Sequence, residues 1–183
     1  GGGTVKYYKF YICSDAGISA LVWNTGALAS CCSANAGFTG PDSNNVVACA
    51  SGQYKATAAS AEACTVCPRN SATGGATGST AVTVCAANEG YTGPDGGTPT
   101  ACSAGHFKAS TGDAACTLCP LNSNSPAASG ELNDCVGVAG YIGQGSSITA
   151  CAANTFKSNA TSSVACGVCP DHSGTGTGTG TAT

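Results

Sequence analysis

The sequence is poor in charge, and this excludes several classes of partner. Only 8% of its 183 residues are Asp, Glu, Lys or Arg, and the formal net charge is -3. No basic run is present, so we expect neither a nucleic-acid surface nor a polybasic contact with an anionic membrane. No apolar run approaches the roughly 18 residues of a membrane span. We therefore expect no direct membrane span.

Methionine is absent, and the sequence begins at Gly1 without a recognisable signal peptide. This indicates a mature form or a fragment. Large core residues are also scarce, because Gly, Ala, Ser and Thr dominate, and small side chains bury little apolar area. Ordering the backbone costs about 1–2 kcal/mol per residue, so burial alone is not expected to hold the fold.

Cysteine is the residue that is abundant. An even count at regular spacing is typical of disulfides formed in an oxidising compartment, and a bridge that closes a loop of about 15 residues stabilises a fold by roughly 3 kcal/mol. We therefore predict an extracellular or cell-surface protein. All 14 cysteines are candidate disulfide residues: Cys13, Cys31, Cys32, Cys49, Cys64, Cys67, Cys85, Cys102, Cys116, Cys119, Cys135, Cys151, Cys166 and Cys169.

The cysteines mark an internal repeat of about 50 residues. One half of the unit reads Cys-x-x-(Gly/Asn)-x-(Tyr/Phe)-Lys, then Ala-Cys-x-x-Cys-Pro, and opens at Cys49, Cys102 and Cys151. The other half runs from Cys32, Cys85 and Cys135 through Gly-(Phe/Tyr) to the next opening cysteine. The units predict an N-terminal strand and possible intermolecular donor (1–12), a partial unit (13–48), two full repeats (49–101 and 102–150), a partial repeat (151–173) and a low-complexity Gly/Thr tail (174–183).

Little regular structure is expected inside each unit. Gly-Tyr-Thr-Gly-Pro-Asp is turn chemistry, and short β-hairpins are predicted around Tyr54 and its copies, with one helical turn near residues 58–63. The predicted fold class is small and disulfide-rich: elongated tandem cysteine-rich repeats with short β-hairpins and little helix. Six recurring aromatic residues are expected to pack on the disulfides as a miniature core, or else to stack on a ligand: Phe38, Tyr54, Tyr91, Phe107, Tyr141 and Phe156.

The unit Cys-x-x-Gly-x-(Tyr/Phe)-Lys…Cys-x-x-Cys-Pro-x-Asn-Ser…Cys…Gly-Tyr resembles cysteine-rich modules of growth-factor-receptor type, including tumour necrosis factor receptor repeats and ephrin-receptor-like modules. The small-residue composition and the Cys-x-x-Cys period more closely resemble ciliate surface proteins of the immobilisation-antigen type. The resemblance covers roughly residues 13–170. It implies elongated, loop-rich modules stacked end to end outside the cell.

By analogy with the receptor repeats, the resemblance implies that the first cysteine of a unit bonds the second, and the third bonds the fourth. The spacing equally allows crossed pairing, first with third and second with fourth. The implied bonds are Cys49–Cys64, Cys67–Cys85, Cys102–Cys116, Cys119–Cys135 and Cys151–Cys166, with Cys13 bonded to Cys31 or Cys32.

This pairing leaves two cysteines: Cys169 and whichever of Cys31 and Cys32 does not bond Cys13. Because Cys169 needs a fourth-position partner and the spare cysteine is of that class, we expect head-to-tail polymerisation of the chain with itself. The alternative is a fragment of a longer chain, whose next segment supplies that partner. Residues 4–12, β-branched and aromatic, form the strongest predicted strand; it either adds to the sheet edge of a neighbour or pairs within its own chain.

No constellation for enzymatic, metal or cofactor chemistry emerges. Zinc ribbons need two Cys-x-x-Cys knuckles closer together than these, and no helix-opening context supports a redox Cys-x-x-Cys. His106 takes a slot that holds Gln53 and Thr155 in sister units, so the slot does not require imidazole. We expect no catalytic, cofactor-binding or metal-binding residue.

Two recurring charged positions have structural interpretations. Asp42 and Asp95 recur, but the third copy has Gly145 instead, which favours a turn role. The lysines that follow the recurring aromatic residues are interpreted as solvated strand residues; they are Lys55, Lys108 and Lys157.

Glycans are a possible covalent addition. Asn159-Ala-Thr is the only Asn-x-Ser/Thr sequon. The Gly/Thr tail exposes hydroxyls suited to O-linked sugars, at Thr175, Thr177 and Thr179. The leading functional hypothesis is an extracellular structural protein, a subunit of a surface coat, appendage or filament. The alternative is a receptor-like or antigen-like ectodomain that binds a protein ligand.

Overall fold

The computed structural model describes residues 33–40, 46–58, 60–159, 163–176 and 179. Within these residues the regular structure consists of short antiparallel hairpins, each made of two strands of two residues. In chain order the pairs are β1 (Phe38–Thr39) with β2 (Val47–Ala48), β3 (Gln53–Tyr54) with β4 (Thr65–Val66), β5 (Ser71–Ala72) with β6 (Ala86–Ala87), β7 (Tyr91–Thr92) with β8 (Thr100–Ala101), β9 (His106–Phe107) with β10 (Thr117–Leu118), β11 (Ser123–Asn124) with β12 (Val136–Gly137), β13 (Tyr141–Ile142) with β14 (Thr149–Ala150), and β15 (Thr155–Phe156) with β16 (Gly167–Val168).

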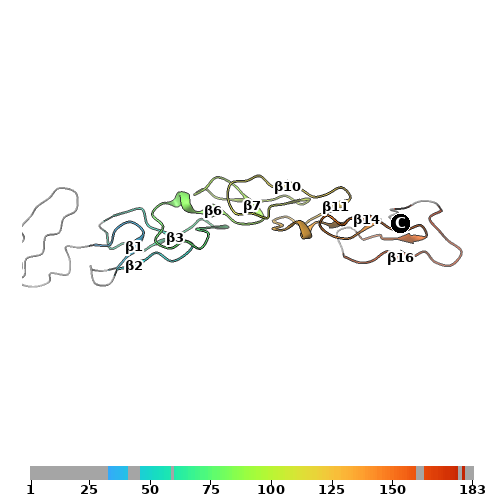
Figure 1. Cartoon of the computed structure of the whole chain (residues 1–183), viewed down its shortest axis with the longest axis horizontal. Coiled ribbons are helices and arrows are strands. Elements are labelled where there is room, and N and C mark those ends of the chain that lie inside the picture. The colour runs from blue at the N-terminus through green and yellow to red at the C-terminus, as the bar shows by residue number, and fades with distance from the viewer. Residues whose placement is uncertain (1–32, 41–45, 59, 160–162, 177–178, 180–183) are drawn as a thin grey trace, which may run out of the picture.

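The hairpins follow one another along one axis, in chain order, from β1 to β16 (Figure 1). The predicted fold class is therefore confirmed: the molecule is disulfide-rich, built of tandem hairpins, and has little helix. Two 3-10 turns, η1 (Val82–Val84) and η2 (Leu132–Asp134), are the helical elements of the described residues.

The helical turn expected near residues 58–63 is wrong for the part of that stretch that the structure describes, residues 58 and 60–63. The backbone groups of Ser60 have partners elsewhere. Its N–H donates to Ala34 O at 3.2 Å, and its carbonyl accepts from Lys55 Nζ at 2.7 Å. These contacts hold the segment against the preceding hairpin instead of allowing hydrogen bonds along a helix.

A left-handed residue precedes the first strand of every one of these hairpins. Glycine adopts positive φ without a Cβ clash, and asparagine tolerates it better than most residues. The turn therefore fixes where each hairpin begins. The φ values lie between 62° and 81° at Gly37, Gly52, Asn70, Gly90, Gly105, Asn122, Gly140 and Asn154.

Three hairpins make one repeat. β1–β2, β7–β8 and β13–β14 are equivalent, as are β3–β4, β9–β10 and β15–β16. The third type is represented by β5–β6 and β11–β12. Each full unit is thus a set of three hairpins, where the sequence pattern suggested two halves.

Five disulfides join consecutive hairpins: Cys49–Cys64, Cys67–Cys85, Cys102–Cys116, Cys119–Cys135 and Cys151–Cys166. Their Cα–Cα distances lie between 5.6 and 5.8 Å. Each bond links the residue after one second strand to the residue before the next second strand. The pairing implied by the receptor resemblance is confirmed for these bonds, and crossed pairing is wrong. Cys13, Cys31 and Cys32 lie outside the described residues.

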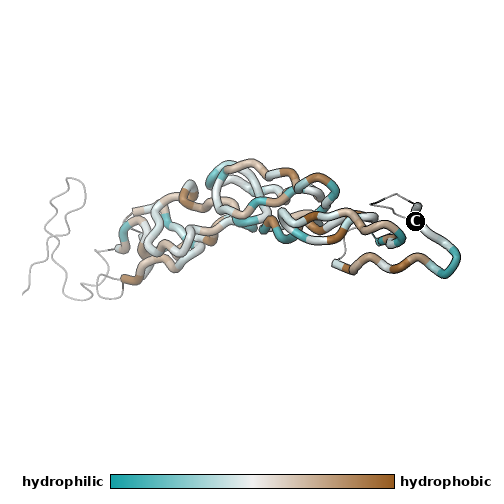
Figure 2. Tube along the Cα trace, turned by 45° about the vertical axis from the view of Figure 1, so that its right-hand side comes forward, coloured by the Kyte–Doolittle hydropathy of each residue, from teal (hydrophilic) through white to brown (hydrophobic). Residues whose placement is uncertain are grey.

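The interior consists of cysteines and small residues. The recurring aromatic residues are half-buried, apart from Phe38, which is exposed, while several disulfide cysteines are almost fully buried. The aromatic miniature core expected from the sequence is therefore not the centre of each module. Apolar and polar segments alternate along the whole tube without gathering into one core (Figure 2).

Candidate functional site

The three recurring lysines are buried, so their interpretation as solvated strand residues is wrong. Lys55, Lys108 and Lys157 are 3%, 2% and 3% exposed. Each follows the first strand of a hairpin of the second type, β3, β9 or β15. In a chain with only 8% charged residues, three buried ammonium groups at one repeat position are the most unusual feature of the fold.

Backbone carbonyls surround each lysine head. Lys55 Nζ donates to the carbonyl oxygens of Ala34 at 3.1 Å, Phe38 at 2.8 Å and Ser60 at 2.7 Å. An ammonium group has three donors and no acceptor. Three carbonyl oxygens therefore match its full donor capacity.

The other two units repeat the arrangement. Lys157 Nζ donates to Gly137 O at 2.6 Å, Tyr141 O at 2.8 Å and Val138 O at 3.5 Å. Lys108 Nζ lies at longer range, 3.5 Å from Ala87 O, and has a second acceptor at 3.4 Å. In every unit the lysine reaches back to carbonyls that precede its own hairpin in the sequence, and Lys108 and Lys157 reach as far as Ala87 in β6 and Gly137 in β12, two hairpins earlier. We call this arrangement the lysine clamp.

Burial has an electrostatic consequence for two of these groups. Desolvation lowers the pKa of Lys157 below its ordinary value of 10.5. Desolvation also lowers the pKa of Lys108, while the negative charges of Asp113, Asp95 and Glu89 act in the opposite direction. Burial therefore disfavours the charged form of Lys108 and Lys157, and their hydrogen bonds to carbonyls offset part of that cost.

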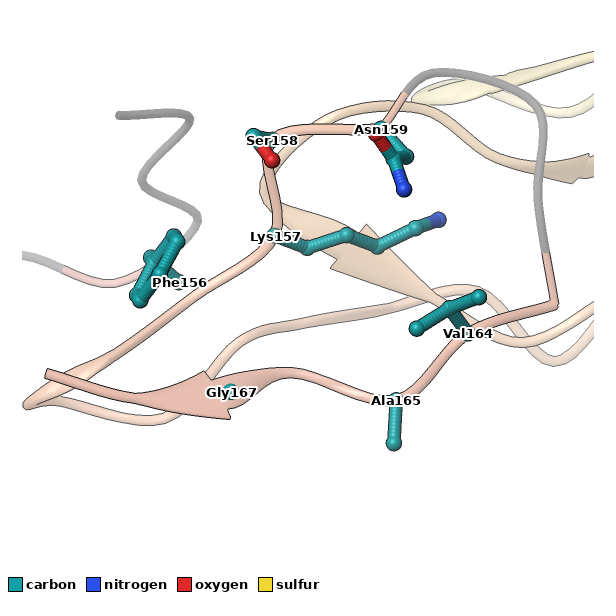
Figure 3. Close-up of a pocket in the computed structure, with 7 residues that line it drawn as sticks. All are labelled: Phe156, Lys157, Ser158, Asn159, Val164, Ala165 and Gly167. Atoms are coloured by element: carbon teal, nitrogen blue, oxygen red, sulfur yellow. The ribbon is translucent and has the colours of Figure 1, made fainter.

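A shallow hollow borders the third clamp (Figure 3). The Lys157 side chain runs beneath the loop that carries Ser158 and Asn159, and Phe156 points away from it. The lysine donates to the carbonyls of Gly137 in β12 and Tyr141 in β13. The hollow thus offers no converging set of polar groups for a ligand.

The histidines do not form a centre. His106 Nδ1 lies 3.2 Å from Ser103 Oγ and 3.4 Å from Ala104 O in its own turn. His172 occupies a left-handed turn position with φ of 61°. Within the described residues, no group of three or more His, Cys, Asp or Glu side chains could hold a metal ion.

The third repeat leaves one cysteine without a disulfide partner among the described residues. Cys169 is a free, half-buried thiol, whereas its equivalents Cys67 and Cys119 bond Cys85 and Cys135. The cysteine spacing also predicts that Cys169 has no partner within its own repeat.

Two short segments beside it are also incomplete. Ser173 and Gly174 are equivalent to β5 and β11, yet they belong to no strand. Ser33 and Ala34 are equivalent to β6 and β12, and they also belong to no strand in the described part of the chain. Within the described residues, neither segment has a strand partner. Sequence spacing alone did not reveal this strand-level match.

The predicted glycan acceptors are only partly described. Asn159 and Thr179 are exposed. Thr175 is half-buried, and its Oγ1 accepts a hydrogen bond from Asn154 N–H at 2.8 Å. Thr177 lies outside the described residues, as do the predicted N-terminal strand (residues 4–12) and Asp42. Asp95 is exposed in a turn, as expected.

One apolar position is exposed in every repeat. Val66, Leu118 and Val168 are the second residues of β4, β10 and β16, and they are 68%, 68% and 79% exposed. Since the module places an aliphatic side chain in solvent three times, the position forms a regularly spaced set along the molecule.

Comparison of the chain with protein-family models and with curated proteins gave no match. None of the helices in the described segments is long and apolar enough to cross a membrane. The chain is a disulfide-rich protein of tandem cysteine-rich repeats, and its function has to be argued from this architecture.

Proposed function

We propose that the protein is an extracellular structural protein, a subunit of a surface coat, appendage or filament that assembles head to tail. The observation that carries this proposal is the linear array of hairpins, in which disulfides link the hairpins within a repeat and buried lysines reach back to the segments before them. Such an array has length and cross-linking but little core. These properties suit an element that spans distance or fills space outside the cell.

The location follows from the chemistry of the cross-links. Disulfides persist in oxidising compartments and are rare in the cytosol. The five bonds of the described residues form a regular series, one for each junction between a hairpin of the first or second type and the next hairpin. This regularity supports a secreted or surface-exposed protein of which the disulfides are the framework.

We propose no enzymatic role. Lys108 and Lys157, whose pKa burial lowers, direct their ammonium groups at backbone carbonyls instead of an open cleft. Catalysis needs groups that converge on a reacting atom. The recurrence of the lysine in successive units supports a structural duty.

Self-association of the purified chain tests the structural role. In an oxidising buffer we expect a ladder on non-reducing electrophoresis that collapses on reduction, and elongated assemblies in electron micrographs. A chain that stays monomeric at every concentration, with and without reductant, contradicts the proposal.

A receptor-like or antigen-like ectodomain is the second candidate, and the exposed side chains of Val66, Leu118 and Val168 favour it. Exposed apolar groups that recur along a molecule are suited to docking a protein ligand. Loss of ligand capture by a soluble monomer after Leu118→Ser would support this alternative. Unchanged self-association in the same variant would support the structural role.

Glycans belong to the same proposal. Asn159 is exposed, and the threonines of the tail offer hydroxyl groups. We expect the intact mass of the native protein to fall on deglycosylation. An unmodified mass contradicts glycosylation without affecting the structural role.

A further inference from the structure

We propose that the described repeats form an extensible tether. Under tension, the disulfide-free segments 86–101 and 136–150 open and lengthen, while the disulfide-closed loops beside them stay closed, and the lysine clamps set the force at which each segment opens. The inference adds a mechanical activity to the structural role proposed above, on which its biological meaning rests, but a single chain is enough to test it.

The disulfides leave one hairpin of each full repeat outside the loops that they close. The hairpin β7–β8 lies in residues 86–101, after the loop closed by Cys67–Cys85 and before the loop closed by Cys102–Cys116. The hairpin β13–β14 lies in residues 136–150, between the loops closed by Cys119–Cys135 and Cys151–Cys166. Neither segment contains a cysteine. The equivalent segment before Cys49 begins outside the described residues.

The path of tension through a repeat follows its disulfides. A disulfide carries the force across its loop, so the residues inside the loop cannot be drawn out while the bond is intact. A pull along the first full repeat therefore crosses Cys49–Cys64, runs through β4 and crosses Cys67–Cys85. Because β4 is already extended, residues 86–101 are the part of this repeat that can lengthen.

The composition of the two segments suits reversible opening. Residues 86–101 and 136–150 contain four glycines each. Glycine-rich chains behave as flexible coils once they are unfolded, so a stretched segment pulls its ends together again when the force falls. Hairpins of this kind form within about 1–10 μs. The closed loops at both ends keep the opened segment short, and refolding therefore needs no distant contact.

Hydrogen bonds to the loops on either side hold each segment closed. For residues 86–101, Asn88 N–H donates to Asn70 O of the preceding loop at 2.9 Å. Gly112 N–H of the following loop donates to Ala87 O at 2.8 Å. Each neutral bond of this kind contributes about 0.5–1.5 kcal/mol. The segment is thus attached at several points, none of them covalent.

The lysine clamps act on these same segments. Lys108 lies inside the loop closed by Cys102–Cys116, and its Nζ donates to carbonyls of residues 86–101. Lys157 lies inside the loop closed by Cys151–Cys166, and its Nζ donates to carbonyls of residues 136–150, those of Gly137, Val138 and Tyr141. Each clamp therefore joins a segment that can lengthen to a loop that cannot. Hydrogen bonds from a charged donor are roughly twice as strong as neutral ones.

The two clamps differ in strength. Lys157 Nζ has two acceptors at 2.6 and 2.8 Å, those of Gly137 and Tyr141. The acceptors of Lys108 Nζ lie at 3.5 and 3.4 Å, and hydrogen bonds weaken at such distances. Residues 86–101 should therefore open at a lower force than residues 136–150.

Single-molecule stretching of the full chain, held by tags at its two ends in a non-reducing buffer, tests the tether. Each segment should open in one reversible step that adds up to about 50–60 Å of contour length, less the folded separation of its ends. Dithiothreitol should introduce further steps, because reduction of each disulfide releases the loop that it closes.

Lysine variants test the clamps in the same experiment. Lys157→Met should raise the opening rate of one step at constant force roughly tenfold and leave the other step unchanged. Lys108→Met should act on the other step, the one at lower force. Arg69→Met is the matched control, since Arg69 is exposed inside the loop closed by Cys67–Cys85 and should affect neither step.

A disulfide variant identifies the segment. Replacing Cys119 and Cys135 together with serine removes one bond and strands no thiol. The loop between them then joins residues 136–150 in the path of tension. The step that responds to Lys157→Met should therefore become about twice as long. Peptide mapping that finds the other four described disulfides intact shows that the variant has folded.

The outcomes separate the tether from the broader proposal. The tether is overturned if no reversible step of this length occurs without reductant, if the serine variant leaves the step unchanged, or if Lys157→Met has no more effect than Arg69→Met. Self-association is measured separately on non-reducing gels. A chain that stays monomeric but opens as expected overturns the assembly and leaves the tether standing, whereas a chain that assembles but shows no such step overturns the tether alone.

Discussion

At the scale of single residues, the lysine clamp explains how a chain with little apolar area joins one hairpin to the next. A buried charge without a counter-ion is costly. Here the ammonium of Lys157 instead satisfies backbone carbonyls that face away from any strand partner. The charge-assisted hydrogen bonds offset the desolvation. The Lys157 side chain thus links β15 to β12 and β13, between which few large apolar side chains are buried.

Replacing Lys157 with methionine should destabilise the protein by about 1–3 kcal/mol, because the carbonyls of Gly137 and Tyr141 lose their donor on burial. Arg69→Met is the control, since Arg69 is exposed and its loss should change the free energy of unfolding by less than about 0.5 kcal/mol. Urea unfolding measures both. Equal effects of the two substitutions would contradict the clamp.

The clamp also predicts a pH dependence of stability. Burial lowers the pKa of Lys157 in the folded state, whereas the unfolded chain keeps a value near 10.5. Between the two values the unfolded state binds more protons, so the free energy of unfolding rises with pH across that window and is flat below it. The neutral amine keeps donating to its carbonyls.

The measurement compares the wild type with Lys157→Met from pH 7 to pH 10.5, with Cys169 alkylated to prevent thiol exchange. The free energy of unfolding of the wild type, minus that of the variant, should increase as the pH rises. A difference that shrinks with pH would show that the carbonyls stabilise the charged form more than burial destabilises it.

The sequence contains a signal for the clamp, although the prediction of solvated lysines was wrong. Lysine recurs at one repeat position in a chain of very low charge, but a lysine beside a strand is solvated in most proteins. Only the folded structure brings the acceptor carbonyls next to the lysine. The carbonyls that bind Lys55 are 5 to 21 residues away in sequence, and no local pattern encodes that meeting.

At the scale of elements, the hairpins are set by their turns. A strand of two residues has almost no intrinsic stability, so the turn and the disulfide define it. Gly90 lies at φ of 76°, and a Cβ there would meet the carbonyl of Ala128, in the loop after β11. Gly52 has φ of 77° with nothing within 4 Å of such a Cβ.

These two glycines form a matched pair. Gly52→Ala should cost about 1–2 kcal/mol, the penalty for a left-handed residue with a Cβ. Gly90→Ala should cost more, since Ala128 must also move and its N–H bond to Cys102 O, at 2.8 Å, is disturbed. Equal costs in urea unfolding would mean that the loop yields freely and that the close approach contributes nothing.

The elements were predictable to different degrees. Gly or Asn before an aromatic or serine residue, between cysteines, marks hairpins such as β7–β8 and β11–β12, and the Cys-x-x-Cys spacing locates the bridges. The crossed pairing could not be eliminated from spacing alone, because both patterns close loops of similar length. The aromatic residues do not form the buried centre that the sequence suggested, because the cysteines occupy it: Cys85 and Cys135 are 1% and 0% exposed, while Tyr91 stays half-buried.

At the scale of the whole molecule, the described residues of each repeat unit contact only the adjacent units, as in other repeat arrays. Stability should therefore be a sum over units and junctions. The unit that begins at Cys102 shows what one unit contributes. It contains three hairpins, two disulfides and one lysine clamp. Nothing in the described residues ties distant units together, so the array should tolerate a change in its length.

Removing residues 102–150 tests this periodicity. The deletion eliminates Cys102–Cys116 and Cys119–Cys135 together, so it strands no thiol. It also moves Lys157 to the sequence position that Lys108 occupies, where Ala87 O becomes available to its Nζ. We expect a shorter protein that keeps the remaining three described bonds and resists protease like the wild type.

Removing residues 102–118 provides the contrast. That deletion also strands no cysteine, because only Cys102 and Cys116 are lost, but it takes out one hairpin of a set of three. Lys108 goes with it, and the carbonyl of Ala87 loses two donors, Lys108 Nζ and Gly112 N–H. Protease should therefore cut the shortened middle region readily while Cys49–Cys64 and Cys151–Cys166 still map as bonded.

Two outcomes would contradict this expectation. If both shortened proteins resist protease equally, the single hairpin is the repeating unit of stability. If both are cut, the stability of a unit depends on more than its immediate neighbours. We expect the first deletion to resist protease and the second to be cut, because removing a whole three-hairpin unit preserves the contacts between neighbouring units and removing one hairpin does not.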